Sequence, residues 1–222
     1  MKYQTKRLIY CVCFSILLGF NSCNIASKNY DQFKSMLRVI NASPPLSKIP
    51  KDLNNKYLYV YNDIQDFSEQ LNLKSIVNDD NELILRVWFN IPGLAIEQRL
   101  VIINFSNDIF SAELMKFKID FINKGSSLLM ISSNKKSVTP KSGWNEFSVK
   151  LFSPTLLSIF DNNTDHGDGG TDIDIFCFEL ITNRHYLFSE FLSPFSSSAK
   201  VQSLQNAREK LKLIEDEFTF YQ

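Results

Sequence analysis

The sequence predicts an α+β fold: a mainly antiparallel sheet of about six to seven strands with two to four helices, including an amphipathic C-terminal helix. Three observations lead to this prediction. Residues 82–138 contain four extended apolar segments separated by short turns, residues 173–192 contain two more, and residues 201–218 space apolar side chains at three and four positions. Short connections between successive strands favour antiparallel neighbours.

The N-terminal part of the domain contains two expected helices and one expected strand. Tyr30–Ile40 spaces its apolar residues at three and four positions, which predicts a short helix. Asn41–Pro50 contains three prolines and predicts a connection. Lys56–Tyr61 is rich in aromatic residues and strand-like, and Asp63–Ile76 predicts a second helix.

The centre of the predicted sheet lies between residues 82 and 138. The third extended segment has the clearest pattern, because every second residue from Met115 to Phe121 is apolar and those between are charged. Such alternation predicts a strand with one face in the core and one in water. We expect an antiparallel meander of Glu82–Asn90, Glu97–Phe105, Phe110–Ile122 and Ser127–Val138.

Two short helices, a hairpin and a long helix are expected after the meander. Gly143–Phe152 and Thr155–Phe160 predict the short helices. Ile173–Thr182 and His185–Leu192 predict the hairpin, and the first of them is apolar on both faces, as in a covered central strand. Val201–Phe218 predicts the amphipathic helix, with Glu209 and Lys212 pointing outward.

The first 23 residues have the order of a secretory leader. Three basic residues precede an uncharged run from Leu8 to Phe20, which is shorter than the roughly 20 apolar residues that span a membrane. Ser22 and Cys23 follow. On these residues the chain resembles bacterial lipoproteins, in which a peptidase cuts before a cysteine that carries diacylglycerol. The resemblance implies lipidation of Cys23, with palmitate among the acyl chains.

This resemblance also implies a domain organisation and a location. Residues 1–22 would be a signal peptide, 23–29 a tether and 30–222 a single α+β domain. The lipid would hold the protein on a membrane of the bacterial cell envelope, facing the periplasm or the exterior. Two alternatives remain open from the sequence: an ordinary secretory signal with a coincidental cysteine, and an uncleaved anchor.

The body of the chain also resembles uncharacterised bacterial lipoproteins. Ser142-Gly143-Trp144 predicts a short Gly-Trp helix, and the hairpin follows it, as in those proteins. The likeness covers roughly residues 80–218, and it implies no activity.

Charge and cysteine content exclude some classes of function. Without the three basic residues of the leader, 21 Lys and Arg face 24 Asp and Glu, which leaves a net charge of −3. A mildly acidic chain without a basic patch predicts no nucleic-acid binding. Cys11 and Cys13 belong to the leader and Cys23 to the anchor, so Cys177 has no expected partner. Its apolar surroundings predict a buried, inert thiol.

The loop between residues 161 and 172 is the candidate metal site. Oxygen-bearing residues at its first, third, fifth and twelfth positions repeat the spacing of a calcium-binding loop. His166 stands where such a loop needs glycine, and the expected continuation is a strand. A solvated turn-rich loop without metal is therefore the alternative. The candidate calcium ligands are Asp161, Asn163, Asp165 and Asp172.

No catalytic residue is assigned from the sequence. His185 is expected to be an exposed or hydrogen-bonded surface residue, and tyrosines at 57, 59 and 61 could stack on a sugar or pack on an edge strand. We therefore prefer a non-catalytic binding domain with a protein or glycan partner. The alternative is an envelope hydrolase that uses carboxylates and the metal loop. Five glutamates, expected on the surface, are the candidates: Glu82, Glu97, Glu113, Glu179 and Glu190.

Overall fold

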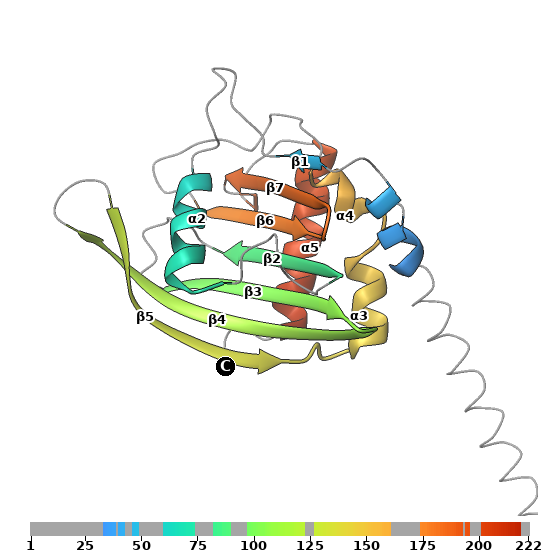
Figure 1. Cartoon of the computed structure of the whole chain (residues 1–222), viewed down its shortest axis with the longest axis horizontal. Coiled ribbons are helices and arrows are strands. Elements are labelled where there is room, and N and C mark those ends of the chain that lie inside the picture. Colours follow the sequence, from blue (N-terminus) through green and yellow to red (C-terminus); the bar gives the residue numbers. More distant parts are fainter. Residues whose placement is uncertain are drawn as a thin grey trace, which may run out of the picture.

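Seven strands form one sheet in the order β1-β7-β6-β2-β3-β4-β5 (Figure 1). The computed structural model describes residues 33–38, 40–42, 46–48, 60–73, 82–89, 97–122, 127–160, 174–192, 194–195 and 201–218, without side chains for 46–48, 119–122 and 127–131. The strands are β1 (Leu46–Lys48), β2 (Leu83–Phe89), β3 (Glu97–Ser106), β4 (Ile109–Ile122), β5 (Ser127–Val138), β6 (Ile175–Ile181) and β7 (His185–Leu192).

The predicted α+β fold class and the antiparallel meander are confirmed. β2 to β5 pair in sequence order, and β6 and β7 form the expected hairpin. β6 also pairs antiparallel with β2, which places the hairpin beside the first strand of the meander. The short β1 adds to β7 in parallel orientation. β6 is therefore a central strand, and all its residues are buried, as its continuous apolar run predicts.

The described helices are α2 (Tyr61–Gln70), α3 (Trp144–Leu151), α4 (Thr155–Ser158), α5 (Gln202–Phe218) and the helical residues 33–38 and 40–42. Helices α2 to α5 and residues 33–38 lie where the sequence predicts helices. The connection expected at Asn41–Pro50 is wrong at its described residues, because residues 41–42 are helical and Leu46–Lys48 forms β1. The strand expected at Lys56–Tyr61 is wrong at its last two residues, because Val60 is the N-cap of α2 and Tyr61 begins the helix and packs its ring on Phe188. Aromatic residues suit a helix that lies on a sheet as well as a strand. Residues 56–59 lie outside the described part.

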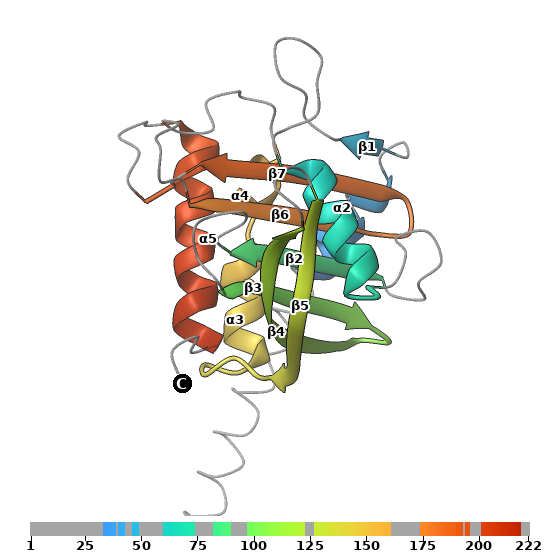
Figure 2. The ribbon, with the colours of Figure 1, turned by 90° about the vertical axis from the view of Figure 1, so that its left-hand side faces the viewer.

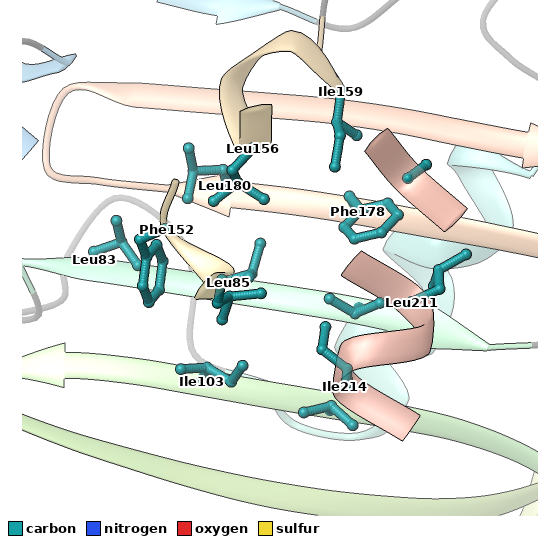
Figure 3. Packing of buried hydrophobic residues seen from close by; sticks show 14 of the residues in the cluster. Leu83, Leu85, Ile103, Phe152, Leu156, Ile159, Phe178, Leu180, Leu211 and Ile214 are labelled. Atoms are coloured by element: carbon teal, nitrogen blue, oxygen red, sulfur yellow. The ribbon is translucent and has the colours of Figure 1, made fainter. Parts of the chain in front are cut away.

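Helices cover both faces of the sheet, and α2 and α5 lie on opposite sides of it (Figure 2). The larger core lies under α3, α4 and α5, where Leu85, Phe178 and Leu211 meet (Figure 3). The smaller core lies under α2, where Ile64 and Phe67 pack on the other face of the same strands. Alternate residues of each central strand therefore belong to different cores.

Lys210 of α5 is a charged residue buried beside the larger core. Its side chain is fully buried, and Nζ donates hydrogen bonds to the Lys150 carbonyl at 2.7 Å and to Ser153 Oγ at 2.8 Å. Glu209 Oε1 lies 3.1 Å from the same nitrogen. Lys210 thus ties α5 to the junction of α3 and α4 by satisfying a carbonyl at the end of α3. The outward positions predicted for Glu209 and Lys212 are confirmed.

Candidate functional site

A pocket of about 660 Å³ lies next to the C-terminal end of α2, over strands β2 to β5. Leu71, Asn72 and Leu73 form the wall on the helix side. Asn72 has a φ of 52°, in the left-handed region where helices commonly end. The chain leaves the helix there, and the sheet face beyond it lines the pocket.

Two rows of cross-strand neighbours form the floor of the pocket. Residues directly opposite each other in neighbouring strands point to the same face of a sheet, so the register places these side chains together. The first row is Ile84, Asn104 and Ser111, and the second is Arg86, Ile102, Glu113 and Ser137. Both rows face the α2 side.

In the described part of the pocket lining, both cationic side chains face a carboxylate. Lys135 Nζ lies 2.7 Å from Glu113 Oε2, and both side chains are partly exposed. Arg86 Nη1 lies 3.8 Å from Glu179 Oε2, and both side chains are buried. The floor of the pocket therefore combines one solvent-exposed ion pair with one buried ion pair.

The outer wall of the pocket is apolar. Phe110 and Trp144 lie there with their rings stacked at a centroid distance of 5.4 Å and an interplanar angle of 13°. Both rings also pack on the larger core, so they lie at the rim where the pocket meets the opposite face of the sheet. Ile109, which is 68% exposed, is a further apolar lining residue near the start of β4.

Glu179 is the centre of a buried polar network behind the pocket. Its Oε2 accepts a hydrogen bond from Trp88 Nε1 at 2.6 Å, and its Oε1 accepts one from the Tyr186 hydroxyl at 2.9 Å. Gln65 Nε2 of α2 donates to the same hydroxyl at 3.2 Å. Together with Arg86, these donors compensate a carboxylate that has no contact with water.

Glu190 is the second buried carboxylate, and it holds the start of α2. Its Oε2 accepts a hydrogen bond from the backbone N–H of Val60, which precedes the helix. A carboxylate at a helix N-terminus satisfies a donor that the helix leaves open, and it interacts favourably with the helix dipole. Glu190 and Gln65 therefore fix α2 on the sheet from two points.

Cys177 is buried, as its surroundings predict. Burial raises the pKa of its thiol well above the usual range, and the charges of Glu190 and Glu179 raise it further. The thiol stays protonated at neutral pH, so it lacks the thiolate that nucleophilic chemistry needs.

Three sequence-based expectations about polar residues are corrected by the structure. His185 is buried rather than exposed, and its Nδ1 lies 3.3 Å from Thr182 Oγ1 within the β6–β7 turn. Glu179 and Glu190 are buried rather than on the surface, because α2 and the smaller core cover their face of the sheet. Glu97 is partly exposed, near Arg99 and Lys116. Glu113 lines the pocket, whereas Glu82, Glu97, Glu179 and Glu190 do not.

Several candidate residues lie outside the described part of the chain. These are Cys23, Tyr57 and Tyr59, and the metal-loop residues Asp161, Asn163, Asp165 and Asp172. Among the residues that the structure does describe, no group of three or more His, Cys, Asp or Glu side chains could hold a metal ion. Calcium binding by the loop therefore stays a prediction.

Arg86, Asn104 and Lys135 are pocket residues that sequence reasoning missed. Within Glu82–Asn90, Arg86 is the one charged residue inside the apolar run of the strand. A charge at such a position indicates a buried polar contact, and this pattern could have identified Arg86. Asn104 and Lys135 stand among ordinary strand residues and carry no such signal.

Comparison with protein families, curated proteins and solved structures finds no match for this chain. None of the helices in the described ranges is both long and apolar enough to cross a membrane. The pocket geometry is therefore the structural basis for a functional proposal.

Replacing Glu179 by Gln should destabilise the fold strongly. The variant removes the negative charge that lies 3.8 Å from the buried Arg86 guanidinium and accepts from Trp88 and Tyr186, and breaking a buried pair costs about 3–5 kcal/mol. Urea unfolding measures the change. Glu97→Gln is the matched control, since Glu97 is 40% exposed and its ion pairs contribute about 0–1 kcal/mol. Equal stabilities of the two variants would contradict the role of Glu179.

Tyr186 should make the fold sensitive to alkaline pH. Burial, followed by the charge of Glu179, raises the pKa of Tyr186 in the folded protein above its usual value of 10.0. Below about pH 10 both states hold the proton. Above that pH the unfolded chain loses the proton first, so the free energy of unfolding falls as pH rises.

Tyr186→Phe removes this contribution. We expect the variant to be about 1 kcal/mol less stable at neutral pH, because a hydrogen bond is lost, and to lose less stability between pH 9 and 11 than the wild type. Urea unfolding across that range measures both effects. If the free energy of unfolding changed with pH equally in the two proteins, the prediction would be wrong.

Proposed function

We propose that the protein is a lipid-anchored binding protein of the bacterial cell envelope and that the pocket beside α2 is its ligand site. The leader supports the anchor, because Cys23 follows a short apolar run and Ser22. The pocket supports the binding role. Its volume of about 660 Å³ lies within the roughly 300–1,000 Å³ of small-molecule sites.

The observation that carries the proposal is the placement of the pocket's polar groups on paired strands. Arg86, Asn104 and Glu113 come from three neighbouring strands of the sheet. Groups on such a scaffold keep their positions better than groups on loops, which favours a pre-formed site. The dry Arg86–Glu179 pair adds rigidity at the floor.

The hydrolase hypothesis has less support. Glycoside hydrolysis commonly uses two carboxylates that flank the scissile bond. Among the described residues that line the pocket, Glu113 is the one carboxylate. Glu179 and Glu190 accept internal hydrogen bonds instead, which accounts for their burial without catalysis.

A bound small molecule should accompany the protein when it is isolated from its own membranes. Native mass spectrometry of the full chain, extracted in mild detergent, is expected to show a non-covalent adduct. Ser111→Trp should abolish this adduct, because the indole fills the pocket beside Asn104. Asn134→Trp is the control, since Asn134 is exposed on the opposite face of β5 and does not line the pocket. Adducts that are equal in both variants would refute the pocket as the site.

Replacing Cys23 by Ser should release the protein from the membrane. Each buried methylene of an acyl chain contributes about 0.8 kcal/mol to membrane binding, and serine offers no thiol to acylate. Cell fractionation and labelling with radioactive palmitate measure the effect. Ser22→Ala is the control, because it keeps a small residue before the cysteine. A Cys23→Ser protein that stays in the membrane fraction would indicate an uncleaved helical anchor.

A further inference from the structure

We propose that the pocket beside α2 binds a neutral saccharide, most simply a short oligosaccharide. This inference rests on the proposed binding function and gives its ligand a chemical class. It follows from the charge balance of the pocket, from its hydrogen-bonding groups and from its apolar wall.

Among the lining residues that the structure describes, the charges compensate one another. Arg86 faces Glu179 and Lys135 faces Glu113, so each positive group already has a negative one beside it. An anionic ligand would meet Glu113 and would compete with it for Lys135. A cationic ligand would meet the two positive groups. A neutral ligand avoids both conflicts, since like charges placed together are unfavourable.

The polar side chains of the pocket both donate and accept hydrogen bonds. Asn104 offers an amide, and Ser111 and Ser137 offer hydroxyl groups. Lys135 adds donors, and Glu113 adds acceptors. A sugar hydroxyl also donates and accepts, so a polyhydroxylated ligand matches this set. A lipid chain would instead bury these groups without new partners, which is unfavourable for every donor and acceptor left unpaired.

The apolar lining residues can contact the apolar faces of a sugar ring. A pyranose ring has C–H faces that pack on aromatic and aliphatic surfaces. Exposed Ile109 and the partly exposed Leu71 and Leu73 offer such surfaces around the pocket, and the partly exposed Trp144 lies at its rim. A small inorganic ion would use none of these side chains, and the pocket is far larger than an ion requires.

Titration of the full chain in detergent with matched trisaccharides tests the inference. The neutral probes are maltotriose, cellotriose and tri-N-acetylglucosamine. The charged probes are trigalacturonate and triglucosamine, the latter being the de-acetylated form of a neutral probe. Calorimetry gives the affinity, and tryptophan fluorescence reports on Trp144. We expect at least one neutral probe to bind and both charged probes to bind more weakly.

Pocket variants locate the binding. Asn104→Ala should weaken the neutral probe about tenfold, the equivalent of one lost hydrogen bond of about 1.4 kcal/mol. Asn134→Ala is the matched control, because Asn134 is exposed on β5 outside the pocket. Lys135→Gln should also weaken binding, whereas Lys136→Gln, one residue along the same strand and outside the lining, should not.

Glu113→Gln tests the charge argument directly. It leaves Lys135 beside an amide, so trigalacturonate should bind this variant more tightly than it binds the wild type. The inference is overturned if a charged probe binds the wild type best, if no neutral probe binds at millimolar concentration, or if Asn104→Ala leaves the affinity unchanged. If the mass adduct disappears in Ser111→Trp but no saccharide binds, the binding function stands and the saccharide inference fails.

Discussion

The buried carboxylate of Glu179 is the constraint on which the α2 side of the molecule depends. An ionised carboxylate inside a protein is tolerated only where charges and hydrogen bonds replace water. Here Trp88 and Tyr186 donate to its two oxygens, and Arg86 supplies the opposite charge. These partners come from β2 and β7, on either side of β6. The network is complete only when all three strands are in register.

Glu190 and this network fix the position of α2, and the short length of the helix leaves part of the sheet face to the pocket. Glu190 holds the N-terminal end of the helix, and Gln65 links its middle to the Glu179 network. A helix of 10 residues is about 15 Å long. It therefore covers only part of one face of the sheet, and the described chain turns away at Asn72. The pocket lies over the sheet face beyond this end.

The sequence predicts most of the elements because each carries a local pattern. The alternation in β4, the continuous apolar run in β6 and the periodic spacing in α5 all report which faces are buried. The buried charges carry no such pattern. Lys210 occupies an inward position of α5, and Glu179 an inward position of β6, yet both residue types normally face water.

The pocket was less predictable than the fold because it depends on long-range pairing. Arg86 and Glu179 are neighbours only because β6 inserts beside β2, which is not an adjacent segment of the chain. Glu113 and Lys135 meet across one strand pair, and Asn104 joins them through β3. Local periodicity assigns each residue to a face but does not specify which faces combine into a concave surface.

One line of cross-strand neighbours connects the buried network to the pocket: Glu179, Arg86, Ile102, Glu113 and Ser137. At its dry end the Arg86–Glu179 pair is fixed, because separating these charges inside the core is costly. At the other end of the row, the Glu113–Lys135 ion pair is partly exposed to solvent and contributes about 0–1 kcal/mol to stability. Separating these two side chains therefore costs little free energy. The row thus runs from a fixed ion pair inside the core to an adaptable ion pair at the pocket, so the Glu113–Lys135 contact can rearrange without disturbing the buried charges that hold the three central strands together.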